Sequence, residues 1–377
     1  MNIKYLELKK ITAMHGEEIQ QAVRDVVESG WYLQGETVGR FESRYADYCR
    51  QRYCVTCANG LDALTLALRA CREAGEMDDG DEIIVPANTY IATILAITEN
   101  RLKAVLVEPD MKTFQIDDTA VEQAITSRTK AVMLVNLYGR NAYTDSIGAL
   151  CERYRLRLMV DAAQSHGVYH IRETEDRYPW LMANATFLHS FYPGKNLGAL
   201  GDGGALTTND EALASMVRTL ANYGSSRKYI FDYCGRNSRL DEIQAAVLDV
   251  KLRYLDEDNA RRRDIALYYI NKVKNKRLLL PSLEYWRESV FHIFPVLCED
   301  RGALQQYLAQ RGIQTVIHYP IPPHLQKCYT AGGGLVVPEG GLPVTERIHR
   351  EELSIPCHQA LTMDEVDDIV DALNGFL

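Results

Sequence analysis

The sequence lacks the features of several protein classes. Its 377 residues contain no apolar run near the roughly 20 residues that a membrane helix needs, and its first residues lack the apolar core of a secretory signal. Lysine and arginine (42) are outnumbered by aspartate and glutamate (51), and the formal net charge of -9 argues against general affinity for nucleic acids or anionic membranes. We therefore expect a cytoplasmic protein that binds small molecules.

The nine cysteines do not have the pattern of a disulfide framework, because their number is odd and they are scattered, several within apolar runs. Cys54 and Cys57 form a C-x-x-C, but on a strand their side chains would point to opposite faces. No second pair or histidine cluster follows at the spacing of a zinc site. We expect reduced, buried thiols and no metal. The sequence also has no internal repeat and no low-complexity segment.

Short apolar runs alternate with amphipathic stretches over the first half of the chain. The runs predict strands at 82–85, 104–107, 131–135, 156–160 and 185–188. The stretches between them predict helices, for example at 61–72, 91–99, 119–126 and 144–154. This alternation is typical of an α/β protein whose mostly parallel sheet is covered by helices on both faces. Ligands of such sheets bind at the carboxyl ends of the strands.

The length exceeds one compact core and predicts two domains. Residues 240–272 contain no proline or glycine and predict one long helix that leads out of the first domain. Beyond it the sequence predicts strands at 290–297 and 314–317, helices at 303–310 and 363–373, and a Pro/Gly-rich loop at 319–343. We therefore expect a large α/β domain over 1–250 and a smaller C-terminal α+β domain over 251–377.

Lys195 follows the turn residues Pro193 and Gly194, shortly after a predicted strand. A lysine amine reacts with a carbonyl carbon when it is deprotonated and aimed, which a rigid turn and a partly desolvated pocket favour. A surface lysine in a glycine-rich loop would give the same pattern. A P-loop is excluded, because Asn196 rather than serine or threonine follows the lysine and the upstream glycine is missing. Lys195 is thus a candidate Schiff-base lysine.

Asp161 directly follows the apolar run 156–160, which places it at the carboxyl end of a strand. Taken alone, it could simply cap the next helix. Together with Lys195, it is also a candidate partner for the nitrogen of a pyridine ring. A carboxylate against a pyridine nitrogen keeps that nitrogen protonated, so that the ring can accept the electrons released when a substrate loses its α-proton. The pair is what pyridoxal phosphate (PLP) needs for transamination.

Residues 58–61 follow a strand candidate and open a helix. The backbone amides of Gly60 and Leu61 would then face outward at the positive end of the helix dipole, where phosphate binds. Asn-Gly is also a common turn before a helix. Ser190 would add a hydroxyl donor. Tyr90 begins a helix after another strand and could stack on a pyridine ring, or only pack in the core.

Together these motifs resemble the sugar aminotransferases of the DegT family, which are fold-type I PLP enzymes that aminate nucleotide-linked keto sugars. The resemblance spans nearly the whole chain. It is carried by the segments 30–35, 58–64, 86–93, 160–167, 190–205, 222–225, 235–246 and 317–324.

The resemblance implies a role for each cofactor residue. Lys195 would be the Schiff-base lysine and general acid/base, Asp161 would pair with the pyridine nitrogen, and Gln164 would contact the region of the ring's phenolic oxygen. Tyr90 would cover the ring. The phosphate would be held by Gly60, Leu61 and Ser190. Asn237 would reach in from the neighbouring subunit of a homodimer whose sites lie at the subunit interface.

For the sugar nucleotide, the resemblance implies Tyr32 of the partner subunit, Tyr192 and Lys228 near the diphosphate, and His318 near the hexose. The motif at 191–202 looks like that of enzymes that aminate C-3 of a dTDP-3-keto-6-deoxyhexose. Members that act at C-4 more often have His-Pro before the lysine.

Three positions distinguish this chain within the family. Leu61 stands where many relatives have threonine, which fits the C-3 group and removes one possible hydroxyl donor to the phosphate. His189 stands where an aromatic residue is more usual. Members that perform 3-dehydration have histidine in place of the lysine, so Lys195 argues against dehydration.

The resemblance therefore implies two half-reactions. L-Glutamate would give its amine to PLP and leave as 2-oxoglutarate, and the pyridoxamine phosphate form would then aminate the sugar, giving a dTDP-3-amino-3,6-dideoxyhexose for a surface polysaccharide, glycoprotein or secondary metabolite. One alternative is amination at C-4 of a nucleotide sugar, or of a cyclitol ketone. Another is a non-catalytic regulator that binds sugar nucleotides, although the sequence retains Lys195 and Asp161 and has no appended DNA-binding segment.

Overall fold

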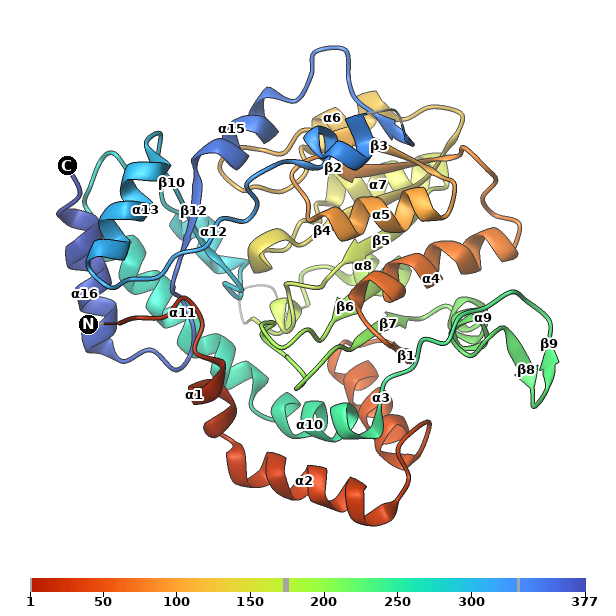
Figure 1. Cartoon of the computed structure of the whole chain (residues 1–377). Helices are drawn as coiled ribbons and strands as arrows, with labels where there is room; N and C mark the ends of the chain where they lie inside the picture. Colours follow the sequence, from red (N-terminus) through yellow and green to blue (C-terminus); the bar gives the residue numbers. More distant parts are fainter. Residues whose placement is uncertain (1, 172–175, 331–332) are drawn as a thin grey trace.

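A computed structural model describes residues 2–171, 176–330 and 333–377 (Figure 1). At its centre is an eight-stranded sheet with the order β1-β7-β6-β5-β4-β2-β3-β11. The strands are β1 (Tyr53–Cys57), β2 (Glu82–Pro86), β3 (Lys103–Val107), β4 (Thr129–Val135), β5 (Arg157–Asp161), β6 (Thr186–Ser190), β7 (Gly204–Thr208) and β11 (Leu335–Val336). All neighbours are parallel except at β7, which is antiparallel to both β1 and β6. The expected α/β class with a mostly parallel sheet is confirmed.

Helices cover both faces of this sheet, because successive strand residues are apolar on both sides. Ile83 and Val85 face a layer that contains α4 (Gly60–Glu73), α5 (Ile91–Glu99) and α9 (Glu211–Ala221). Ile84 faces the opposite layer, which contains α6 (Asp118–Ala124), α7 (Asp145–Tyr154) and α8 (Pro179–Asn184). Next to that layer, α3 (Glu36–Tyr48) and α10 (Glu242–Leu252) cover β1 and β7. Cys54 and Cys57 lie in different clusters, so they do point to opposite faces of β1.

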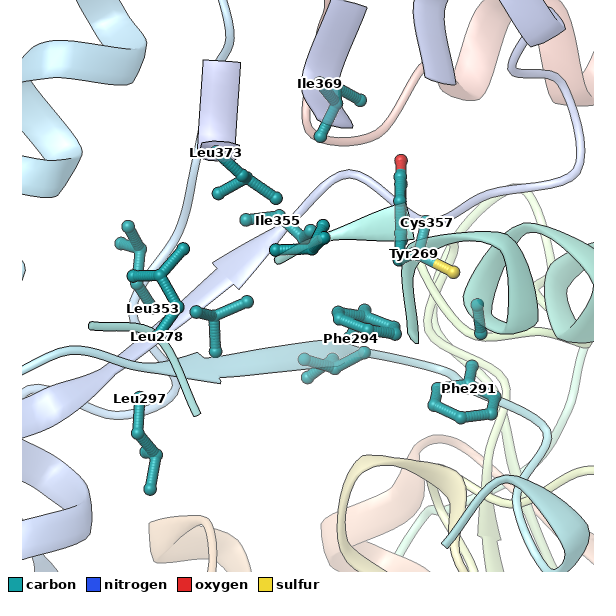
Figure 2. Close-up of a cluster of buried hydrophobic side chains, with 14 of the residues drawn as sticks. Tyr269, Leu278, Phe291, Phe294, Leu297, Leu353, Ile355, Cys357, Ile369 and Leu373 are labelled. Atoms are coloured by element: carbon teal, nitrogen blue, oxygen red, sulfur yellow. The ribbon is translucent and has the colours of Figure 1, made fainter. Parts of the chain in front are cut away.

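The C-terminal part of the chain builds a second lobe around an antiparallel pair, β10 (Phe294–Leu297) and β12 (Glu352–Ile355). The lobe also contains α11 (Leu255–Lys272), α13 (Arg301–Gln310) and α16 (Met363–Asn374), and Figure 2 shows its core, in which Phe294, Ile355 and Leu373 are buried. Ile3 and Tyr138 belong to the same core. The lobe thus packs directly against the N-terminus and the segment after β4. The boundary between residues 250 and 251 stays a prediction.

The strands and helices predicted for the large sheet are present, with ends that differ by two residues at most. The single helix expected over 240–272 is wrong, because α10 and α11 are separate helices. Arg253 and Tyr254 form tight i to i−3 hydrogen bonds at the end of α10, and the Tyr254 ring stacks on His15 with 3.8 Å between centroids.

Other expectations for the C-terminal lobe also need correction. The strand expected at 290–297 is limited to β10, and residues 314–317 contribute only an isolated bridge between Val316 and Ser354. The region 319–343 is not a plain loop, since it contains α14 (Lys327–Thr330) and β11; its residues 331–332 lie outside the described residues. β11 has two residues and pairs with β3, far away in the sequence, so local composition gives no signal for it.

Three further parts complete the chain. Before the sheet, α1 (Leu8–Ala13) and α2 (Gly16–Ser29) lie along α10 and the start of α11 (Figure 1). The hairpin β8 (Ser225–Arg227) and β9 (Ile230–Phe231) projects beyond α9 at the edge of the molecule (Figure 1). The lobe carries the short α12 (Leu283–Arg287) and α15 (Pro343–Glu351). Within the described ranges, no helix combines the length and the apolar character that crossing a membrane would need, and the cytoplasmic location stays a prediction.

Candidate functional site

A cavity of about 630 Å³ lies between the carboxyl ends of the central strands and the C-terminal lobe. Val135, Asp161 and Ser190, the last residues of β4, β5 and β6, line it on the sheet side. This is the edge of a parallel sheet where ligands bind. Nine predicted site residues line the cavity: Gly60, Leu61, Tyr90, Asp161, Gln164, Ser190, Tyr192, Lys195 and His318.

Asp161 is buried at the end of β5 and is held by two hydrogen bonds. The Thr93 hydroxyl donates to Oδ2 at 2.8 Å, and the Ala163 amide donates to Oδ1 at 3.1 Å. Burial raises the pKa of Asp161, while these two donors and the nearby Lys195 act in the opposite direction. The carboxylate is therefore fixed in orientation, and a cationic group in the cavity would stabilise its charge further.

Lys195 follows the turn that sequence analysis singled out, and its backbone amide donates to the Tyr192 carbonyl at 2.8 Å. Burial lowers the pKa of the Lys195 amine to about 8, and the carboxylate of Asp161 raises it in part. With a pKa of about 8, roughly a tenth of the amine is unprotonated at pH 7, far more than for an ordinary lysine. Such an amine can act as a nucleophile and can exchange protons with a substrate.

The N-terminus of α4 meets the ends of two strands at very close range. The Asn59 side chain caps the helix by accepting from the Asp62 amide at 2.9 Å, and a helix leaves its first amides, here those of Gly60 and Leu61, without an intrahelical acceptor. A Cβ at Gly60 would lie 2.5 Å from the Ser190 Cβ, so only glycine permits this approach. Two backbone amides and a hydroxyl thus converge at one end of the cavity, as an anion site requires.

Two tyrosines and a glutamine form the side of the cavity next to Asp161. Gln164 donates from Nε2 to the Tyr319 hydroxyl at 3.0 Å, and its Oε1 accepts from the Tyr138 amide at 2.7 Å. The ring of Tyr90 lies 4.9 Å from the ring of Tyr319, at a tilt of 39°. Tyr90 is half exposed, directly precedes α5 and lines the cavity, so its ring is accessible to a ligand there.

His318 lines the cavity from the C-terminal lobe and is held from three directions. Its amide donates to Oε2 of Glu352 at 2.7 Å, its Nδ1 lies 2.8 Å from the Ser354 hydroxyl, and its carbonyl accepts from the Tyr138 hydroxyl. Burial and the charge of Lys195 lower the pKa of His318 to about 4, so the ring is neutral at pH 7. Because Nδ1 is engaged, Nε2 is the ring nitrogen that remains for a ligand.

The other three predicted residues are exposed and are not among the described residues that line the cavity. Tyr32 lies between α2 and α3, and its carbonyl accepts from the Glu242 amide at 3.0 Å. Lys228 lies at the turn of the β8–β9 hairpin, with Nζ 5.3 Å from the Tyr229 ring centroid. Asn237 forms a backbone bridge with Asn222. One chain therefore does not bring these residues to its own cavity.

Several functional candidates were missed from the sequence. Thr93 and Tyr319 lie inside the motif segments 86–93 and 317–324, and a cavity-facing role could have been suspected from that position alone. Arg262 and His292 also line the cavity. They had no local signal, because only the packing of α11 and the segment before β10 against the sheet brings them there.

Comparisons with known proteins point to one enzyme family. The model of the DegT/DnrJ/EryC1/StrS aminotransferase family matches residues 13–374. A dTDP-3-amino-3,6-dideoxy-alpha-D-galactopyranose transaminase of Aneurinibacillus thermoaerophilus is 48% identical over 391 residues, covering 99% of each chain. A dTDP-3-amino-3,4,6-trideoxy-alpha-D-glucose transaminase of Streptomyces venezuelae is 40% identical, covering 98% of this chain and 95% of that protein. The crystal structure of S. venezuelae DesV in complex with a ketimine intermediate has a TM-score of 0.91 and 38% identity, covering 99% of this chain and 98% of that one.

Proposed function

This chain belongs to the DegT/DnrJ/EryC1/StrS aminotransferase family, and we propose that it moves the amino group of L-glutamate to C-3 of a dTDP-3-keto-6-deoxyhexose. The products are a dTDP-3-amino-3,6-dideoxyhexose and 2-oxoglutarate. The observation that carries this proposal is the pair of Lys195 and Asp161 in one cavity at the carboxyl ends of the strands. The two dTDP-sugar relatives above are named for 3-amino products, which supports C-3 as the position of amination.

The residues of the cavity fit PLP, the cofactor of this family. When bound, PLP supplies a ring that accepts electrons from the carbon that loses its proton. The fixed carboxylate of Asp161 would face the pyridine nitrogen, and Tyr90 would cover the ring. The amides of Gly60 and Leu61 and the hydroxyl of Ser190 would hold the phosphate. The Gln164 carboxamide would contact the phenolic oxygen side, held in place by Tyr138 and Tyr319.

Lys195 would carry the proton in both half-reactions. Its amine has a pKa of about 8 because it is buried, so it can take a proton from the substrate carbon and return one at a pH near neutrality. The same group removes the α-proton of glutamate in the first half-reaction and moves a proton at the sugar carbon in the second. A charged amine of ordinary pKa would do this far less well.

Tyr192, two residues after β6, and His318, on the C-terminal lobe, would bind the sugar nucleotide. Tyr192 is exposed at the cavity, next to the turn that carries Lys195. Neutral His318 would present Nε2 to a hexose hydroxyl, since Ser354 engages Nδ1. A buried polar group that pairs with one hydroxyl discriminates against the epimer that cannot reach it.

We propose a homodimer that shares its sites. Tyr32 and Asn237 would act in the cavity of the partner chain, with Lys228 near the diphosphate. Trp31, Tyr32, Tyr229 and Phe231 are more than half exposed, and exposed aromatic side chains are enriched in protein interfaces.

Mixing two inactive variants tests the shared site. In a heterodimer of Lys195→Ala and Asn237→Asp chains, one site combines the intact Lys195 of one chain with the intact Asn237 of the other. After subunit exchange, we expect about a quarter of the wild-type activity, because half of the dimers have one intact site of two. If Asn237 acts in its own chain, no activity returns on mixing. Each variant alone is the control.

The substrate proposal is tested with purified protein loaded with PLP. Glutamate should change the absorbance of the bound cofactor, and addition of dTDP-3-keto-6-deoxy-glucose or its galacto epimer should then give a 3-amino product, identified by mass and NMR. A response to glutamate with turnover of 4-keto sugars only would favour the C-4 alternative. No response to glutamate would overturn the aminotransferase assignment and favour a binding role.

A further inference from the structure

Behind the cavity, four side chains and a carbonyl form a continuous buried chain of hydrogen bonds. His166 Nε2 lies 2.9 Å from the Ser190 carbonyl, and His166 Nδ1 lies 2.8 Å from the Tyr45 hydroxyl. The same hydroxyl lies 3.0 Å from His189 Nδ1, and His189 Nε2 lies 3.0 Å from the Thr207 hydroxyl. All four side chains belong to buried residues. They come from α3, the segment after β5, β6 and β7.

The Ser190 carbonyl is the last acceptor of this hydrogen-bond chain, and it determines which group donates and which accepts in every other bond. A carbonyl has no proton, so His166 must donate to Ser190 from Nε2. In a neutral ring, Nδ1 of His166 is then an acceptor, and it takes the single hydroxyl proton of Tyr45. His189 therefore cannot accept from Tyr45 and must donate to it from Nδ1. Its Nε2 is left as the acceptor for the Thr207 hydroxyl.

Both rings are neutral at pH 7. Burial lowers the pKa of His166 to about 4, with a smaller contribution from the charge of Lys195, and burial also lowers the pKa of His189. The Cys49 thiol interacts with Tyr45 and Thr207 and stays protonated, because burial raises its pKa to about 12. A thiol is a weak donor and acceptor, so it does not alter the order of the stronger bonds.

The hydrogen-bond chain ends at Ser190, the residue that sets the geometry of the proposed phosphate site. Ser190 pairs with Gly204 across β6 and β7, and the N-terminus of α4 is wedged against both. A Cβ at Gly204 would lie 2.2 Å from the Asn59 carbonyl oxygen, as a Cβ at Gly60 would lie 2.5 Å from Ser190 Cβ. Contacts this close leave little freedom, so a shift of Ser190 would move its hydroxyl relative to the Gly60 amide.

We propose that Thr207, His189, Tyr45 and His166 form a one-directional hydrogen-bond chain in which the two histidines have opposite tautomers, and that they are positioning residues for Ser190. The second half of this inference rests on the proposed function, since it assigns Ser190 to the cofactor phosphate. His189 thereby receives a role. Its Nδ1 donates a hydrogen bond to the Tyr45 oxygen, and the Tyr45 hydroxyl donates its own proton to His166.

The tautomers can be measured without any activity. In protein labelled with ¹⁵N-histidine, long-range ¹H–¹⁵N correlation spectra distinguish a protonated from an unprotonated ring nitrogen. His166 should carry its proton on Nε2 and His189 on Nδ1. The chain has nine histidines, few enough to assign these two signals by comparison with the His166→Asn and His189→Phe variants. The same tautomer in both histidines, or a doubly protonated ring at pH 7, would contradict the proposed hydrogen-bond chain.

A matched pair of variants tests the positioning role. Glutamine at 166 places its amide near the Nε2 position and can still donate to Ser190, whereas asparagine places its amide near Nδ1 and cannot reach that carbonyl. His166→Asn should therefore bind PLP about tenfold more weakly than His166→Gln, the effect of one lost hydrogen bond. Tyr45→Phe should fall between His166→Asn and Thr207→Val, since the loss should shrink with distance from Ser190.

Melting temperatures without cofactor separate positioning from general destabilisation. If PLP affinity across the four variants follows the melting temperature rather than the distance from Ser190, the positioning role is wrong. Wild-type protein that does not bind PLP would refute the proposed function, and the tautomer measurement would still decide the hydrogen-bond chain.

Discussion

The two halves of the proposed site differ in how much of their geometry a single chain supplies. We call Gly60, Asp161, Ser190 and Lys195 the cofactor floor, and Tyr32, Lys228 and Asn237 the outer rim. The floor residues line one cavity, and hydrogen bonds or close packing hold each of them. The rim residues are exposed and lie on loops and a projecting hairpin. Contacts within one chain hold the cofactor floor in place, whereas the outer rim would complete a site only with a partner chain, as proposed above.

Substitution at the floor should have the largest effect of all. Lys195→Ala removes the group that accepts and returns the proton, so we expect amine transfer to fall by about 10⁴-fold. The variant should still fold and bind pyridoxamine phosphate, because Asp161 and the phosphate site remain. Single-turnover absorbance with glutamate measures the loss. Substantial turnover would remove Lys195 from its proposed role.

Lys251 offers a matched control for that variant. It is partly buried, burial also lowers its pKa to about 8, and its Nζ donates to the Gly198 carbonyl at 2.6 Å. It is not among the described residues that line the main cavity. Lys251→Ala should therefore lose stability but keep amine transfer within about tenfold, the range expected from indirect effects of one lost hydrogen bond.

The second largest effect on activity is expected for the carboxylate of the cofactor floor. Asp161→Asn keeps the shape of the side chain but removes the charge that would face the ring nitrogen, so both half-reactions should slow by about 10²-fold or more. Thr93→Val leaves the charge and removes one donor to Oδ2, so it should cost about tenfold. Separate measurement of the glutamate and sugar half-reactions checks this. Unchanged rates in Asp161→Asn would mean that another group faces the ring nitrogen.

A change at the rim should be milder and confined to one half-reaction. Lys228→Ala should raise the KM for the sugar nucleotide by about three- to tenfold, the size of one exposed ionic contact to a phosphate. The glutamate half-reaction should keep its rate, because that substrate has no diphosphate. Steady-state kinetics with each substrate varied in turn gives both values. An equal loss in the two half-reactions would mean that Lys228 belongs with the cofactor floor rather than with the outer rim.

The last expected effect is on stability rather than on activity, and it depends on pH. Burial raises the pKa of Glu352 to about 8, so the folded chain keeps a proton that the unfolded chain releases near the ordinary value of 4.5. This proton makes its full contribution to the free energy of unfolding at low pH. The contribution is lost as pH rises towards 8, by at most about 1.4 kcal/mol per pH unit. Glu352→Gln cannot titrate, so its unfolding free energy relative to the wild type should increase from about pH 6 to about pH 8. Urea unfolding at several pH values measures this, and a constant difference would contradict it.

The cofactor floor could be predicted from the sequence for a physical reason. In a parallel sheet the ends of neighbouring strands meet at one edge, so Asp161 and Ser190 were placed by the strand pattern alone. The Gly60 turn and the Lys195 turn follow strands in the same way. The α/β class and the helices on the sheet were predictable because apolar periodicity is a local property.

What the sequence did not reveal depends on contacts between distant segments. Thr93, Tyr319 and Glu352 gain their roles from hydrogen bonds to residues that the fold brings close, and β11 exists only because β3 lies beside it. The separation of α10 from α11 follows from tight turns and from the stacking of Tyr254 on His15. The role of His189 follows only from the fold, which places His166 and His189 on either side of the Tyr45 hydroxyl.

The position of β11 has a consequence for biosynthesis. Its partner strand β3 is complete early in translation, but Leu335, which pairs with Ala104, emerges only when most of the chain has been made. Until then β3 is an open edge of apolar residues, a surface that invites association between nascent chains. A fragment ending at residue 250 would keep that edge permanently. We therefore expect such a fragment to aggregate through β3 rather than persist as an independent domain.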